Sequence, residues 1–236
     1  MLMPTKRKPN ATPRPFSESS WLPWPDMLSA GVRIRFKILA ELYELIEDAI
    51  ASRTADIEKT YRAAETDSCR DRNEVEEYGE YLAEELHQLE DIKREASLLH
   101  AVSLYHRLEN ELKTIFAWRF NGLADPQKKH LMWRVHNWKD FQKLTKTHFS
   151  FDVASVAHFH AVNKLRCIAN AVKHKQGNVT RELHGLTGWP PNRPIEVANV
   201  DLKRLREACV RFFSDFSEKA ERSMEKMFGN PAKARK

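Results

Sequence analysis

The stretch of sequence that decides the fold runs from Val75 to Phe120 and reads VEEYGEYLAEELHQLEDIKREASLLHAVSLYHRLENELKTIFAWRF. Its apolar residues recur at nearly heptad spacing, which is typical of one face of an α-helix: Val75, Tyr78, Leu82, Leu89, Ile92, Ala96 and Leu99. An unbroken helix of about 50 residues would span on the order of 75 Å, longer than a compact domain requires. The segment therefore predicts an all-α protein.

A second periodic segment precedes this one, from about Ser29 to Ala64. Its apolar residues recur at intervals of three, four or their sums: Ile34, Ile38, Leu42, Leu45, Ala49 and Ile57. The polar stretch from Glu65 to Asn73 separates the two segments. We therefore expect residues 26–97 to form a long antiparallel helical hairpin that projects from, or packs beside, a C-terminal bundle.

Residues 98–228 are expected to form that C-terminal helical bundle. Asp125-Pro126 follows a break at Asn121 and begins a new helix, since proline suits a first helical turn. Three more segments read as helices, from Gln127 to Thr147, from Asp152 as N-cap to His174 with Gly177 closing it, and from Asp201 to Phe228. Gly185 to Val200 contains Gly188 and three prolines and reads as an irregular loop.

Charge divides the chain into parts. The 236 residues carry a formal charge of +6. Residues 1–25 form a proline-rich, basic leader that we expect to be disordered, and residues 229–236 form a basic tail. Residues 37–111 hold 9 basic and 20 acidic residues, whereas residues 112–228 hold 21 basic and 11 acidic residues. The hairpin is therefore acidic and the bundle basic, and only the bundle's charge bears on the candidate site described below.

Composition excludes several classes of protein. Seven glycines in 236 residues disfavour a glycine-rich doubly wound fold or a turn-rich β-sandwich. No apolar run reaches the roughly 20 residues of a membrane helix, and the N-terminus lacks a secretory apolar stretch. We find no phosphate-binding glycine loop, nucleophile elbow or zinc-ligand spacing. We therefore expect a cytoplasmic protein with no membrane partner, no metal and no cofactor.

The segment with the most chemistry is LRCIANAVKHKQG, residues 165–177. On a helix, Leu165, Ile168, Ala169 and Val172 would form a buried stripe, and Arg166, Asn170 and His174 would align four apart on a neighbouring face beside Lys173. His174 would fall in the last turn of this helix, at the negative end of the helix dipole. Such a face offers donors to a phosphate and an acid/base to a phosphodiester, but the same spacing also occurs on plain solvated or interface faces.

The pattern L-R-x-x-A-N-x-x-K-H-x-x-G resembles the signature helix of the HEPN superfamily, and the upstream segment from Tyr105 to Leu112 resembles the first bundle helix of such proteins. The similarity covers roughly residues 98–216. It implies a helical bundle that dimerises over a composite cleft and, in many members, a metal-independent ribonuclease of toxin-antitoxin or phage-defence systems. In that scheme His174 acts on the ribose 2′-hydroxyl or the leaving oxygen, Asn170 orients phosphate or histidine, and Arg166 or Lys173 stabilises the developing charge.

One position departs from the family pattern. The catalytic motif places Arg immediately before the polar residue, where this chain has Ala169. Either Arg166 or Lys173 substitutes for it, or catalysis has been lost.

Further residues are candidates for contacts around this helix. We expect Lys164, Lys175 and Arg181 to contact RNA, and Trp189 to stack on a base or a partner side chain. Glu109 and Lys113, four apart, are expected to form an ordinary intrahelical ion pair rather than to take part in the cleft.

Three functions remain open on the sequence. The first is an RNA-binding HEPN-like homodimer, with or without ribonuclease activity. The second is a non-catalytic module of the same fold, in which the acidic hairpin recognises a protein partner. The third is a coiled-coil scaffold whose basic tails dock on nucleic acid.

Overall fold

The computed structural model describes residues 25–66, 71–121 and 123–228. The expected leader, apart from Pro25, and the expected tail at 229–236 lie outside these ranges. The described residues form seven α-helices and no strand, which confirms the all-α class. The helices are α1 (Pro25–Thr66), α2 (Arg72–Arg119), α3 (Asp125–Arg134), α4 (Trp138–Phe149), α5 (Phe159–Lys175), α6 (Arg181–Thr187) and α7 (Leu202–Phe228), with two 3₁₀ turns at Val153–Ser155 and Val197–Asn199.

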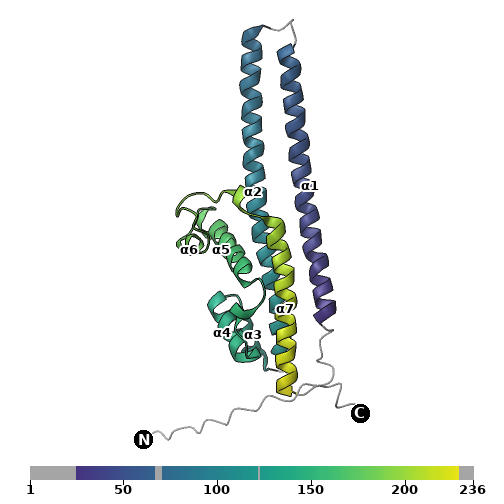
Figure 1. Cartoon of the computed structure of the whole chain (residues 1–236), viewed down its shortest axis with the longest axis vertical. Helices are drawn as coiled ribbons and strands as arrows, with labels where there is room; N and C mark the ends of the chain where they lie inside the picture. The colour runs from purple at the N-terminus through teal and green to yellow at the C-terminus, as the bar shows by residue number, and fades with distance from the viewer. Residues whose placement is uncertain (1–24, 67–70, 122, 229–236) are drawn as a thin grey trace.

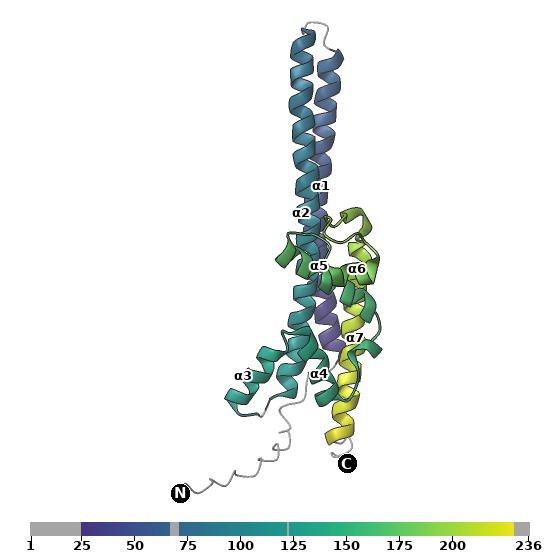
Figure 2. The ribbon, with the colours of Figure 1, turned by 90° about the vertical axis from the view of Figure 1, so that its left-hand side faces the viewer.

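The two longest helices, α1 and α2, form the expected antiparallel hairpin (Figure 1). Asp71 caps α2 by accepting a hydrogen bond from the backbone N–H of Asn73. In the upper half the pair is held by Ile57, Ala64 and Leu82, which are buried between the helices. Figure 2 shows that this half projects beyond all other helices. The hairpin thus extends away from the basic half of the chain instead of folding back over it.

The main core surrounds the lower half of α2, against which α1, α5 and α7 pack (Figure 1). The Phe116 ring of α2 contacts the rings of Phe120, Phe141, Phe149 and Phe216 at centroid distances of 5.1 to 6.4 Å. Val32 and Phe36, in the first turns of α1, belong to the same buried cluster. The expected boundary between residues 97 and 98 therefore falls inside α2, and part of the hairpin contributes to the bundle core.

Two expected helices have different bounds in the structure. The segment from Gln127 to Thr147 is two helices, because Asn137 caps α4 by accepting from the backbone N–H groups of Lys139 and Asp140. Asp152 caps only the short 3₁₀ turn that follows it, through the N–H of Ala154 at 2.8 Å, and α5 begins seven residues later. The expectation of one helix in each segment was wrong.

The expected loop at 185–200 also overlaps a helix. α6 spans Arg181–Thr187 and is capped by the Thr180 hydroxyl, which accepts from the N–H of Leu183. This short helix packs on α5. The remaining residues before α7 are irregular apart from the 3₁₀ turn at Val197–Asn199.

Gly177 ends α5, as the sequence predicts. Its N–H donates to the carbonyl of Ala171 at 3.1 Å, and its φ of +75° is a conformation that glycine adopts without strain. A Cβ at this position would lie 3.3 Å from Cδ1 of Leu98 on α2. Glycine therefore allows both the turn and the close approach of α5 to α2.

None of the helices in the described ranges combines the length and the apolar character that a bilayer-spanning helix needs.

Candidate functional site

The α5 helix is buried on several sides, not along one stripe. Leu165, Ile168 and Ala169 are fully buried as predicted, and Val172 is partly buried. Cys167 and Ala171 are also fully buried although they lie elsewhere around the helix. The face expected to be open for a substrate is therefore covered along part of its length.

Arg166 lies in this covered part and is only 6% exposed. Its guanidinium donates to Oδ1 of Asn163 at 3.0 Å, forms an ion pair with Glu182 of α6, and lies 5.3 Å from the ring centroid of Trp138. Sequence reasoning missed Glu182 and Trp138 because they lie 16 and 28 residues from Arg166. The guanidinium of Arg166, which the sequence analysis expects to bind a phosphate, is therefore already bound to other side chains of the protein.

Ala169 occupies the position at which the HEPN catalytic motif has Arg, and it is fully buried. The side chain faces the interior of the bundle, within the cluster formed with α2 and α7. A longer, charged side chain has no solvent to reach at this point. The position therefore serves packing in this chain.

The last turn of α5 is the exposed part. Lys173, His174 and Lys175 are exposed, and Asn170 is half-buried. Within the described ranges, no hydrogen bond or ion pair joins the side chain of Asn170 or His174 to another residue. The structure thus places Asn170, Lys173 and His174 near one another. Arg166 lies one turn before Asn170 and is in contact with Glu182 and Trp138.

Lys173 lies near a polar cluster on α2. Glu109 Oε2 is 3.5 Å from Nζ of Lys113 and 3.3 Å from Nδ1 of His106, and its other oxygen is 4.0 Å from Nδ1 of His136. The pKa of Lys113 is lowered, first by burial and also by Lys173, while Glu109 acts in the opposite direction. The predicted Glu109–Lys113 pair is present. His136 joins it from the turn between α3 and α4, which periodicity alone does not reveal.

The three residues expected to contact RNA do not share one environment. The Lys164 ammonium lies 4.7 Å from the ring centroid of Trp189, so this lysine, and not a base, covers that ring. Its pKa is lowered by burial and by Arg204, against the effect of Asp201. Lys175 and Arg181 are exposed. By helical position, Lys164 and Lys175 lie on the side of α5 opposite to Arg166 and Lys173.

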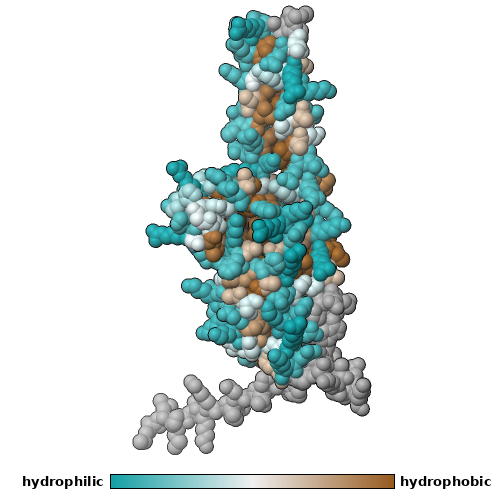
Figure 3. Space-filling view, viewed as in Figure 1, coloured by the Kyte–Doolittle hydropathy of each residue, from teal (hydrophilic) through white to brown (hydrophobic). Residues whose placement is uncertain are grey.

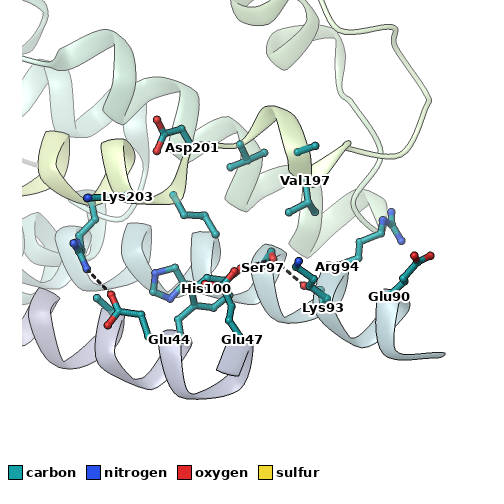
Figure 4. A pocket seen from close by; sticks show the side chains of 16 residues that line it. Glu44, Glu47, Glu90, Lys93, Arg94, Ser97, His100, Val197, Asp201 and Lys203 are labelled. Atoms are coloured by element: carbon teal, nitrogen blue, oxygen red, sulfur yellow. Dashed lines mark hydrogen bonds and ion pairs between the residues drawn. The ribbon is translucent and has the colours of Figure 1, made fainter. Parts of the chain in front are cut away.

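A cleft of about 870 Å³ lies where the hairpin leaves the bundle, between α1, α2 and the start of α7 (Figure 4). Tyr43 stacks on His100 at 4.5 Å and shares a 2.6 Å hydrogen bond with the Ser97 hydroxyl. Burial, aided by Arg206, lowers the pKa of His100 to about 4, so the imidazole is neutral near pH 7. Arg206 Nη1 lies 4.0 Å from Oε1 of Glu44.

This cleft carries balanced charge. Its lining includes four acidic residues (Glu44, Glu47, Glu90 and Asp201) and four basic residues (Lys93, Arg94, Lys203 and Arg206). Arg94 also lies beside Gly177, so the end of α5 reaches the rim of the cleft. Sequence analysis did not predict this cleft, because its walls come from three separate stretches of the chain, residues 40–47, 90–100 and 197–206.

Two buried cysteines do not add nucleophiles to either site. Burial raises the pKa of Cys167 to about 11 and raises that of Cys209 as well. Both thiols are therefore protonated at neutral pH. No group of three or more His, Cys, Asp or Glu side chains within the described ranges is arranged to hold a metal ion.

The chain matches no protein-family model, no curated protein and no solved structure. The HEPN resemblance therefore rests on the residues of α5 and α2 described above.

Proposed function

We propose that this protein is a non-catalytic, HEPN-like interaction module of the cytoplasm, which acts by binding another protein chain. The observation that supports this proposal is the environment of two residues of α5, Arg166 and Ala169. Arg166 is engaged by Glu182 and Trp138, and Ala169 is buried where the catalytic motif has arginine. His174 thus lacks the arginine that would stabilise charge on a phosphate.

The long hairpin supports an interaction role. The upper halves of two helices project well beyond the core (Figure 2). Lower down, at the level of the bundle, a cleft of about 440 Å³ is lined in part by Ile38, Leu39 and Val102. Projecting helices with accessible apolar side chains suit recognition of another helix. In this proposal the bundle is the anchor, and the hairpin provides the binding surface.

The test is cleavage of a mixed-sequence RNA without added metal, by the full chain and by His174→Ala. His87→Ala, an exposed histidine on α2, is the matched control. We expect no cleavage above buffer for any of the three proteins. The non-catalytic assignment would be overturned if the wild type and His87→Ala cleave the RNA and His174→Ala does not.

A second function, RNA binding with ribonuclease activity, is favoured by one observation. Lys173 and His174 are exposed next to each other in the last turn of α5, and Lys173 lies near Lys113. Here Lys173 takes the role of the missing arginine, Asn170 orients the phosphate and His174 exchanges the proton of the 2′-hydroxyl.

RNA binding is tested separately from cleavage. If α5 binds RNA, Lys173→Ala and Lys175→Ala should each weaken binding and reduce its salt dependence by about one unit of slope, in contrast to Lys146→Ala on α4. Fluorescence anisotropy at several salt concentrations measures both quantities. Equal binding and equal slopes in all three variants would remove α5 from RNA recognition.

A further inference from the structure

The outer face of α1 is apolar and is not covered by the other helices in the described ranges. Ile34, Ile38, Leu42 and Leu45 follow one another at helical spacing and are 61%, 57%, 57% and 66% exposed. The opposite side of the same helix, with Phe36, is already buried in the core. In Figure 3, brown side chains reach the right-hand edge of the molecule at a few places among hydrophilic ones, where α1 runs in Figure 1.

This face is unusual for a helix on the surface of a bundle. Single exposed apolar residues are ordinary, but a surface helix normally has polar residues opposite its buried stripe. In α1, four large apolar side chains occupy successive turns of the outward face. The pattern is typical of a helix that packs on both sides.

The apolar surface continues from α1 onto α2. Ile38 and Leu39 line a cleft with Val102 and Ser103 of α2, and Leu99, one turn away from Ser103 on the same face, is 58% exposed. A stable dimer buries about 800 Å² on each partner, more than four side chains supply. The exposed apolar side chains of α2 add to the surface that a second copy can cover.

The charges along one edge of this face indicate which partner fits. At 100° per residue, Arg33, Lys37, Glu41 and Asp48 lie on the same flank of the apolar stripe, with the basic residues first and the acidic residues after them. The Lys37 and Glu41 side chains are 76% and 53% exposed. When two copies of one helix meet antiparallel about a two-fold axis, each flank faces the same flank of the other copy in reverse order.

We propose that a second copy of this chain docks antiparallel along the outer face of α1, forming a symmetric dimer. The contact is centred near residue 40, so Ile34 of one copy lies opposite Leu45 of the other and Lys37 lies opposite Glu41. A parallel pairing brings no such opposite charges together. This inference rests on the proposed interaction function and names its partner and surface.

The first test measures mass against concentration for the full chain by sedimentation equilibrium. We expect a reversible dimer of twice 27.6 kDa. Ile38→Glu combined with Leu42→Glu should weaken the dimer about a hundredfold or more, because two apolar contacts on each copy are lost. Leu186→Glu, an exposed apolar position on α6, is the matched control and should leave the dimer intact.

The second test uses charge reversal and depends on the antiparallel geometry. Lys37→Glu places two acidic groups opposite each other in a homodimer, and Glu41→Lys places two basic groups there. A mixture of the two variants restores both opposite pairs, so the heterodimer should form in preference to either homodimer. Native mass spectrometry of the mixture, with one variant labelled by ¹⁵N, measures this preference.

Three outcomes would overturn the inference. They are a monomeric wild type at about 100 μM, a dimer that withstands the Ile38/Leu42 double substitution, and a mixture without heterodimer preference. A monomer would mean that a different chain, or residues 1–24, covers the stripe. None of these outcomes bears on RNA cleavage, so failure of the dimer is distinguishable from failure of the non-catalytic assignment.

Discussion

Removing the Arg166 side chain should destabilise the protein, because this side chain holds α5 to its neighbours. Arg166→Ala loses the hydrogen bond to Asn163, the contact with Trp138 and the ion pair with Glu182. A hydrogen bond to a charged group contributes about 1.5 to 3 kcal/mol, and a cation–π contact adds about 0.5 to 2 kcal/mol. The Glu182 side chain is 59% exposed, so solvent screening leaves its ion pair little additional effect.

The expected loss is therefore about 3 kcal/mol in the free energy of unfolding. For a chain of this length, the loss corresponds to a fall of roughly 6 to 12 °C in Tm. Helical circular dichroism followed against urea and against temperature measures both quantities. Lys175→Ala, at an exposed position of the same helix, should change the free energy by less than about 0.5 kcal/mol. Equal stability of Arg166→Ala and Lys175→Ala would refute the structural role and return Arg166 to the list of groups free to bind phosphate.

Three further predictions address the surroundings of the site. Gly177→Ala should cost about 1 to 3 kcal/mol in urea unfolding, because alanine is strained at φ +75°, whereas Gly185→Ala, with no atom near its Cβ, should be neutral or slightly stabilising. Ala169→Arg should cost more than about 3 kcal/mol or prevent folding, since it buries a charge in a filled position, and retention of wild-type Tm would contradict the burial described. The pKa of His100 falls from 6.5 to about 4 on folding. Between these two pH values the unfolded chain therefore binds a proton at His100 that the folded chain does not bind. The free energy of unfolding should drop by up to about 3 kcal/mol as pH falls through this window, and by less in His100→Gln.

The long helices could be predicted because each repeats one physical pattern. Apolar spacing located α2 to within a few residues, and the same reasoning found most of α1 and α7. The break between α3 and α4 was missed because Leu131, Val135 and Trp138 keep helical spacing across the turn. The signal was Asn137, whose side chain caps α4. Apolar periodicity indicates that a helix has an apolar face, but it does not reveal a cap.

The candidate site was predictable only in part. The sequence located Lys173 and His174 in the last turn of a helix, and they are exposed there. It could not show that α6 folds back on α5 and brings Glu182 to Arg166, because that contact depends on residues 178–184, to which the sequence analysis assigned no helix or loop. The apolar outer face of α1 was visible as periodicity, but only the structure shows that the core lies on the other side.

The central claim is that α5 has a structural role and does not cleave RNA. Its most direct test is the metal-free cleavage assay on the wild type beside His174→Ala and His87→Ala. The account predicts no cleavage above buffer by any of the three. Cleavage by the wild type and by His87→Ala, together with its absence in His174→Ala, would contradict it.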